Sequence, residues 1–180
     1  MTEESQHPGR DGVAHGPVID YDQLRSLVEQ AVPFNRFTGV ELVELADGRA
    51  KARLGLVDDL RNHVGTMHAA ALFQVAEFAA ASAFVGAFAV HMNKVTFVAR
   101  KAEIDYSGPA RGDVEAIGKL TGETAEVLRE VSERGHTRTG AVGEARDPDG
   151  VVVATVRVTF DVRPLDEPLA VDLPVREGAR

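Results

Sequence analysis

The sequence contains no cysteine and no tryptophan, and it has only two tyrosines among its 180 residues. The absence of cysteine excludes disulfides, thiolate zinc sites and cysteine nucleophiles. Positive charge is also scarce, because 20 lysine and arginine residues face 28 acidic residues and the net charge is −8. Binding to a nucleic-acid backbone requires clustered lysine and arginine, so we expect no nucleic-acid partner.

Signals for targeting, metal binding and serine chemistry are lacking as well. The N-terminal segment MTEESQHPGRDG has neither the basic nor the apolar region of a signal peptide, which predicts a cytoplasmic protein. His63, His68 and His91 belong to no His-Glu-x-x-His pattern and have no carboxylate pair nearby in the sequence, so we expect no metal and no other cofactor. The missing Gly-x-Ser-x-Gly motif argues against a serine hydrolase.

The length and the 44% apolar composition predict a single folded domain. We place this domain at residues 18–164. Residues 1–17 and 165–180 are rich in glycine, proline and charge, which predicts flexible tails at both ends.

One long apolar stretch runs from Ala69 to Val90 and is long enough to cross a bilayer. However, it consists mostly of alanine, it carries Gln74 and Glu77, and no aromatic belt marks its ends. We therefore expect the buried core helix of a folded domain and no membrane partner. Glu77 is the one charge in this helix, and a buried carboxylate must be protonated, paired or used.

The remaining ordered segments mostly alternate between apolar and polar residues, as half-buried strands do. In one of them the apolar parity changes at Arg100 and Lys101, which predicts a β-bulge. The predicted strands are Arg49–Val57, Asn93–Tyr106, Asp113–Thr121, His136–Arg146 and Val151–Val162.

Two shorter helices complete the prediction. Asp20 has the character of an N-cap for a helix that ends at Pro33, and a second helix is predicted around Thr124 to Arg134. One long buried helix with five or six antiparallel strands is the content of an α+β domain in which a sheet wraps around the helix.

The segment from Asn62 to Ala70, Asn-His-Val-Gly-Thr-Met-His-Ala-Ala, resembles the start of the central helix in hotdog-fold acyl-CoA thioesterases of the phenylacetate-degradation and 4-hydroxybenzoyl-CoA types. Those enzymes carry Asn, Gly and His-Gly-Gly there, with an acidic residue nine positions after the histidine, as Glu77 follows His68. The resemblance covers about residues 33–162 and is strongest to an uncharacterised thioesterase-like hotdog family. It implies a hotdog fold and a homodimer or dimer of dimers. Ala69 and Ala70 replace the usual glycines, which narrows the approach of a substrate.

The chemistry of these residues suits attack on a thioester. Thr66 is predicted as the N-cap, which leaves the N–H groups of Met67, His68 and Ala69 to stabilise an oxyanion. Glu77 then acts as the nucleophile or as the base that activates water. Ala69 and Glu77 are separated by about 12 Å along one helix, so we predict that two subunits of a homodimer contribute to each site.

Each remaining site residue has a functional and a structural interpretation. Asn62 either holds the thioester carbonyl or orders the loop, and Gly65 either admits the substrate or supplies a positive φ angle. His68 either orients the loop through a hydrogen bond or is a satisfied, partly buried histidine, and we favour the structural role. The predicted acyl-binding residues are Thr66, Met67, Phe73, Ala81 and Phe84, although aromatic residues at helical spacing more often pack against a sheet.

The expected substrate is an acyl-CoA or an acyl-carrier thioester. Two other functions are also consistent with these residues. One is a non-catalytic acyl-binding or assembly protein, in which Glu77 is protonated in a dimer interface. The other is a hotdog dehydratase or hydratase, which pairs a loop histidine with a helix glutamate, as the fourteen-residue spacing of His63 and Glu77 resembles.

Overall fold

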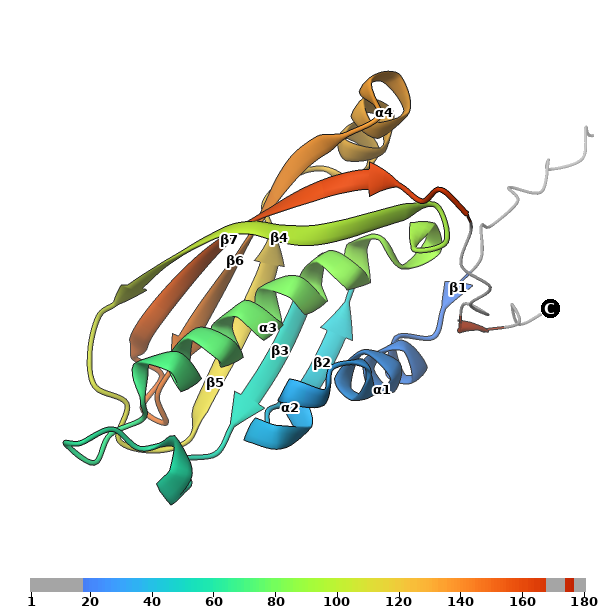
Figure 1. The fold of residues 1–180 in the computed structure, drawn as a ribbon. Coiled ribbons are helices and arrows are strands. Elements are labelled where there is room, and N and C mark those ends of the chain that lie inside the picture. Colours follow the sequence, from blue (N-terminus) through green and yellow to red (C-terminus); the bar gives the residue numbers. More distant parts are fainter. Residues whose placement is uncertain (1–17, 168–173, 177–180) are drawn as a thin grey trace, which may run out of the picture.

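The structure, a computed structural model, describes residues 18–167 and 174–176 (Figure 1). Its α-helices are α1 (Tyr21–Ala31), α2 (Pro33–Thr38), α3 (Ala69–Ala87) and α4 (Thr124–Arg134), and two short 3-10 helices cover Asp58–Leu60 and Ala89–His91. The strands are β1 (Val18–Ile19), β2 (Glu41–Ala46), β3 (Arg49–Leu54), β4 (Val95–Tyr106), β5 (Val114–Leu120), β6 (Thr137–Arg146), β7 (Val152–Pro164) and β8 (Val175–Arg176).

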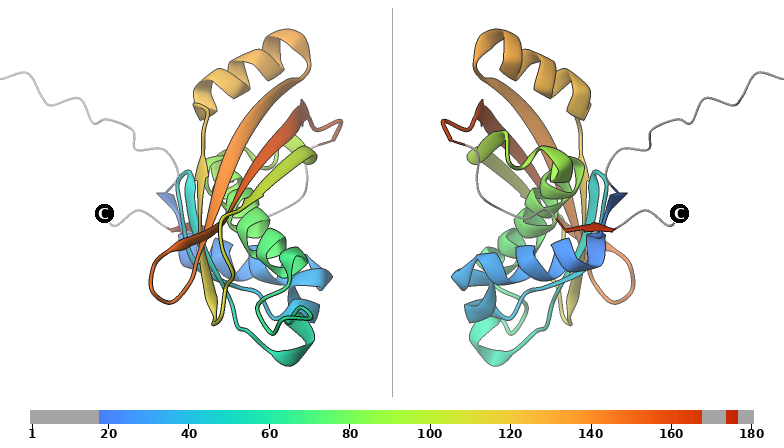
Figure 2. Two further views of the ribbon diagram at one scale, coloured as in Figure 1. Left: turned by 90° about the vertical axis from the view of Figure 1, so that its left-hand side faces the viewer. Right: turned by 90° about the vertical axis from the view of Figure 1, so that its right-hand side faces the viewer.

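Six strands form one antiparallel sheet in the order β2-β3-β5-β6-β7-β4. The sheet curves around α3, which crosses its concave side (Figures 1 and 2). A separate two-stranded sheet pairs β1 with β8. The predicted arrangement of an antiparallel sheet around one long helix is therefore confirmed.

Close contact between α3 and the sheet depends on small residues on both sides. A Cβ atom added to Gly118 would lie 1.9 Å from the carbonyl oxygen of Ala79, and one added to Gly143 would lie 1.9 Å from that of Ala76. Glycine on the strands lets the helix backbone approach this far, and alanine on the helix leaves room for the strands. The alanine-rich composition of α3 is thus a packing requirement.

Aromatic rings fill the wider space beside the C-terminal half of α3. The ring of Phe84 is fully buried. It stacks on Phe88 and meets Phe97 in a tilted arrangement, each at a centroid distance of 4.2 Å. Phe160 of β7 packs against the same ring at 5.2 Å. This cluster joins α3 to β4 and β7.

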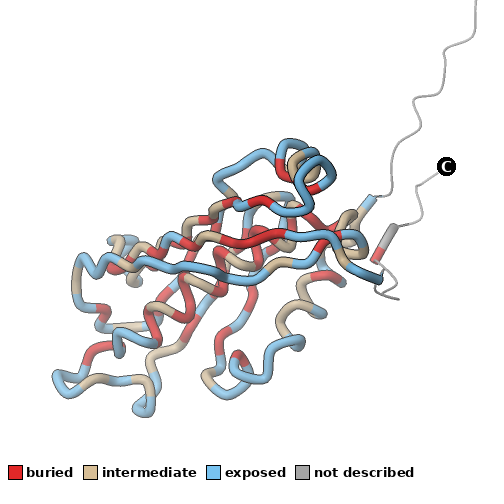
Figure 3. Tube along the Cα trace, turned by 45° about the horizontal axis from the view of Figure 1, so that its top comes forward, coloured by how far each residue is buried: buried red, intermediate tan, exposed pale blue. Residues whose placement is uncertain are grey.

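Strand β4 lies at one edge of the sheet and is unusually open for a strand of twelve residues. Nine of its residues are exposed, including Val98 at 61%, whereas the core of the sheet is buried (Figure 3). Its pairing with β7 shifts register between Ala99 and Lys101, so the predicted bulge is confirmed.

Most predicted element positions agree with the structure. Asp20 caps α1 by accepting hydrogen bonds from the N–H groups of Asp22 and Gln23, and α4 spans the predicted residues. Pro33, predicted only to end a helix, also begins α2, because proline is favourable at the first helical position. The predicted central helix is shorter than expected, since α3 ends at Ala87.

The predicted tails lie mostly outside the described residues. Residues 1–17, 168–173 and 177–180 are not described. Within the predicted C-terminal tail, Val175–Arg176 pair as β8 with β1.

Within the described residues, α3 is the one helix long and apolar enough to cross a membrane. In the folded domain, 67% of its most apolar 18-residue window is buried by the rest of the chain. A buried core helix in a folded domain can be as long and as apolar as a membrane-spanning helix, so the length and composition of α3 do not indicate a membrane span.

Candidate active site

Glu77 lies on the side of α3 that faces away from the sheet. Ala79 contacts the sheet at Gly118, and at about 100° per residue Glu77 projects in nearly the opposite direction. The side chain of Glu77 is half-buried, and it forms no hydrogen bond or ion pair with any described residue. Burial alone raises the pKa of its carboxyl group above the ordinary value of 4.5.

A stripe of incompletely covered residues surrounds Glu77 along α3. Ala70 is exposed, and Phe73, Glu77 and Ala81 are half-buried at successive turns of the helix. To one side of this stripe, Phe84 packs against Phe97 of β4. The open stripe thus brings Glu77 together with two of the predicted acyl-binding residues, Phe73 and Ala81.

The other three predicted acyl-binding residues lie away from this open stripe. Phe84 is fully buried in the aromatic cluster, and Met67 is 2% exposed. Thr66 is also buried, and its hydroxyl accepts a hydrogen bond from the Nδ2 atom of Asn62 at 2.8 Å. In the single chain these three side chains serve packing and loop structure.

The N-cap of α3 is His68, so the prediction of Thr66 is wrong. His68 has extended backbone angles, φ −65° and ψ 143°, and its Nδ1 accepts a hydrogen bond from the N–H of Ala70 at 3.0 Å. The predicted orienting role of His68 takes the form of this cap.

Among the described residues, one of the three predicted oxyanion donors is left without a partner. The N–H of Met67 donates to the carbonyl of Ala110 at 2.9 Å, and the N–H of His68 donates to that of Leu60 at 2.8 Å. The N–H of Ala69 has no hydrogen-bond partner among the described residues. The predicted set of three free donors is therefore wrong, and Ala69 alone presents an unused N–H at the positive end of α3.

Asn62 organises the loop that precedes α3. Its Oδ1 accepts from the N–H groups of Val64 and Thr66 at 3.0 and 3.1 Å, and its Nδ2 also donates to the carbonyl of Met67 at 3.4 Å. Gly65 in the same loop has φ +81°, a conformation that favours glycine. These contacts support the structural interpretation of Asn62 and Gly65.

His63 is exposed in this loop and makes no hydrogen bond to the described part of the chain. A dehydratase would need this imidazole and Glu77 to face one substrate. No hydrogen bond or ion pair joins these two described side chains.

Two further residues near the start of α3 had no predicted role. The hydroxyl of Tyr106, at the end of β4, donates to the carbonyl of Ala69 at 3.1 Å. Gln74 donates from Nε2 to the hydroxyl of Thr38 in α2 at 2.7 Å. Both contacts join residues more than thirty positions apart, so no local sequence signal announces them.

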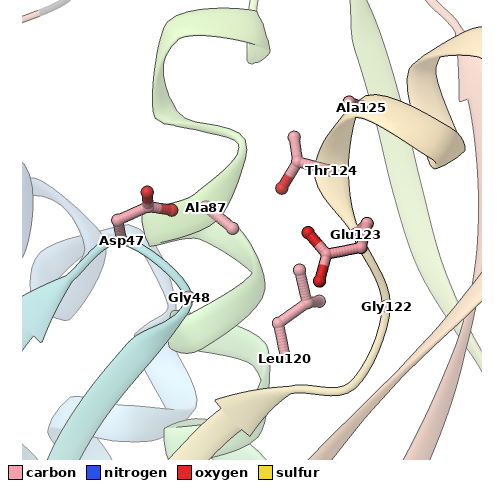
Figure 4. A pocket seen from close by; sticks show the side chains of 8 residues that line it. All are labelled: Asp47, Gly48, Ala87, Leu120, Gly122, Glu123, Thr124 and Ala125. Carbon is pink, nitrogen blue, oxygen red and sulfur yellow. The ribbon is translucent and has the colours of Figure 1, made fainter.

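Three depressions in the described surface are lined by residues other than Phe73, Glu77 and Ala81. One of about 330 Å³ lies near the C-terminal end of α3, where Asp47 and Glu123 point into it from opposite sides (Figure 4). Two acidic groups make it a poor receptor for an anionic carrier such as coenzyme A. Within the described ranges, no group of three His, Asp or Glu side chains lies close enough to hold a metal ion.

A family described as "Domain of unknown function (DUF4442)" matches residues 22–162, which is most of the chain. The chain belongs to the DUF4442 family. Comparison with functionally curated proteins gave no sequence match for this DUF4442 chain.

Solved structures support the fold of this DUF4442 member. A Pseudomonas aeruginosa protein of unknown function, described as a probable thioesterase, is 24% identical with a TM-score of 0.74, over 83% of this chain and 100% of that protein. A mutant of the phenylacetic acid degradation protein PaaI from Thermus thermophilus is 23% identical with a TM-score of 0.58, over 72% and 98%. PaaI from E. coli is 15% identical with a TM-score of 0.62, over 82% and 94%. The DUF4442 chain thus has the predicted hotdog fold.

Proposed function

We propose that this protein is a thioester hydrolase that acts on acyl-CoA or acyl-carrier substrates. The observation that carries the proposal is Glu77, a half-buried carboxylate with no partner in the described chain, on the open stripe of α3. The descriptions of similar structures, a probable thioesterase and phenylacetic acid degradation proteins, point to the same chemistry.

Glu77 supplies the group that starts the reaction. A raised pKa brings a carboxylate closer to the operating pH, where a general base is most effective. The carboxylate either removes a proton from water or attacks the thioester carbonyl itself. In both cases negative charge develops on the carbonyl oxygen.

The free N–H of Ala69 is suited to that charge. It points outward from the first turn of a nineteen-residue helix, where the helix dipole is positive. A fixed donor of this kind stabilises an oxyanion without reorganisation during the reaction. Alanine stands at this position where the resembled thioesterases have glycine, and it keeps the backbone donor.

Each active site is proposed to combine two subunits. Glu77 and Ala69 of one chain are about 12 Å apart along the axis of α3, too far to act on one carbonyl group. The exposed edge strand β4 offers unpaired backbone groups and apolar side chains such as Val98 to a second copy. A homodimer or a dimer of dimers would bring one chain's Ala69 to the partner's carboxylate.

The acyl group is proposed to lie on the open stripe. Phe73 and Ala81 flank Glu77 there and provide an apolar surface. Small residues at exposed positions of β4, Ala99 and Ala102, leave space on the neighbouring strand.

The test is hydrolysis of a panel of acyl-CoA thioesters, with released thiol as the readout. We expect turnover by the wild type and none by Glu77→Gln. Glu126→Gln, on the exposed surface of α4, is the matched control because it removes one negative charge far from the site. Saturable acyl binding without turnover by the wild type would instead identify an acyl-binding protein. Hydration of a 2-enoyl thioester that depends on His63 would identify a hydratase.

A further inference from the structure

The two tyrosines of the chain both donate their hydroxyl groups to backbone carbonyls of α3, one near each end of the helix. The hydroxyl of Tyr21 lies 3.3 Å from the carbonyl oxygen of Gly86, in the last turn. The hydroxyl of Tyr106 lies 3.1 Å from the carbonyl oxygen of Ala69, the first residue of the helix. Tyr106 therefore contacts the residue that carries the unused N–H.

Tyr106 reaches α3 from the end of the edge strand. It is the last residue of β4 and pairs with Ala154 of β7, so the sheet holds its backbone in place. Tyr106 is 50% exposed, and a hydroxyl at the surface could donate to water instead. The hydrogen bond to Ala69 therefore contributes little to the stability of the fold.

The first turn of α3 has few side chains that can hold it. Ala69 and Ala70 carry only methyl groups, and both residues are exposed. Helix ends fray because their terminal backbone groups lack helical partners. Here the peptide group between Ala69 and Ala70 is held from both sides. Its carbonyl accepts from Tyr106, and its N–H donates to Nδ1 of His68 at 3.0 Å.

The peptide group that carries the free donor is fixed as well. It consists of the carbonyl of His68 and the N–H of Ala69, and this carbonyl accepts from the N–H groups of Ala71 and Leu72 at 2.9 and 3.1 Å. Such bonds polarise a peptide group and strengthen its N–H as a donor. The direction of this N–H changes only when these bonds break or when the whole first turn shifts. The contact from Tyr106 opposes that shift.

We propose that Tyr106 positions the oxyanion donor of the hydrolase. The inference rests on the proposed function and deepens it. By holding the carbonyl of Ala69, the Tyr106 hydroxyl keeps the N–H of the same residue aimed at the thioester oxygen, in the site that a second subunit completes with its carboxylate. An aligned donor stabilises the developing charge without reorganisation. Tyr106 makes and breaks no bond in the reaction and is a positioning residue.

A purely structural role makes a different prediction. If the Tyr106 hydroxyl only ties β4 to α3, its loss should resemble the loss of the Tyr21 hydroxyl at the other end of the same helix. Both variants would then be slightly less stable than the wild type and equally active.

The test compares Tyr106→Phe with Tyr21→Phe by steady-state kinetics and urea denaturation of the full chain. Each variant keeps its ring and loses one hydrogen bond to α3, so Tyr21→Phe is the matched control. We expect Tyr106→Phe to lower kcat by about 10-fold with little change in KM, because the donor acts on the transition state. We expect Tyr21→Phe to leave kcat unchanged. Equal kcat values for the two folded variants would overturn the inference.

Subunit exchange provides a second readout that a structural role would not move. In a mixed dimer of Tyr106→Phe and Glu77→Gln, one site joins the intact Tyr106 and Ala69 of one chain to the intact Glu77 of the other. That site should work at the wild-type rate, so exchange should raise turnover from about one twentieth to about one quarter of the wild-type value. Turnover that does not rise after demonstrated exchange would show that Tyr106 does not serve the donor of its own chain, which contradicts the inference.

Failure of this inference can be separated from failure of the proposed function. If the wild type hydrolyses thioesters and Glu77→Gln does not, the function stands whatever Tyr106→Phe does. If the wild type hydrolyses no thioester in the panel, the function itself fails, and the inference fails with it.

Discussion

Ala69 and Glu77 lie eight residues apart on α3, so the free N–H at the start of the helix and the carboxylate in its middle are about 12 Å apart along its axis. The N–H of Ala69 and the carboxylate of Glu77 in one chain are too far apart to contact the same thioester carbonyl. This separation makes the second subunit part of the proposed chemistry, and it can be tested directly.

Mixed dimers of two inactive variants should recover activity. Ala69→Pro removes the N–H donor, and proline is well tolerated at the first helical position. His68 already has the extended backbone that precedes proline, so α3 should remain intact. Subunits of Ala69→Pro and Glu77→Gln, mixed and allowed to exchange, should regain roughly one quarter of wild-type turnover, because half of the dimers are mixed and each holds one complete site.

The control for this mixture is each variant exchanged with itself, which should stay inactive. Exchange must be shown independently, for example by mass spectrometry of differently labelled subunits. Mixed dimers that form without any return of turnover would place both groups of a site in one chain.

Glu77→Gln should stabilise the protein at neutral pH but not at acidic pH. Because the pKa of Glu77 is raised in the folded state, the folded protein binds more protons than the unfolded chain above pH 4.5. The contribution of Glu77 to the free energy of unfolding therefore falls as pH rises from 4.5 through the raised pKa. Urea denaturation of both proteins from pH 4 to 8 should show a difference that grows with pH and then levels off. A difference independent of pH would argue against a raised pKa.

Gly118→Ala should destabilise the domain strongly. The added Cβ would overlap the carbonyl oxygen of Ala79. Both atoms are fixed directly to packed backbone, so neither can rotate away. We expect a loss of about 3 kcal/mol in the free energy of unfolding, measured with urea. Gly108→Ala is the matched control, because a Cβ there meets nothing within 4 Å and should change stability little.

His68→Ala should weaken the start of α3. Loss of the hydrogen bond from Ala70 to Nδ1 should cost about 1 kcal/mol in the free energy of unfolding. His68→Asn should recover part of this loss, since asparagine is a favourable N-cap. His63→Ala, in the same loop but exposed, should leave stability unchanged, and an equal loss in that variant would show that the loop rather than the cap is responsible.

The strands were predictable because alternation of side chains is a local property of the chain. Even the bulge in β4 could be located, since the change of parity at Arg100 and Lys101 is visible without any partner strand. Glu77 stood out for the same reason, as one charge among apolar neighbours. The N-cap of α3 was predicted wrongly, because histidine is seldom a cap and Thr66 had the more usual side chain.

The sequence by itself determined that a long alanine-rich helix carries a carboxylate inside a wrapped antiparallel sheet. Only the tertiary structure decided which backbone donors stay free, since the partners of Met67 and His68 are the carbonyls of Ala110 and Leu60. It also decided that the Glu77 side of α3 is left open and that Gln74 is anchored by Thr38. Periodicity shows which local structure a segment prefers. Whether a backbone donor finds an acceptor depends on segments that are distant in the sequence and that folding brings together.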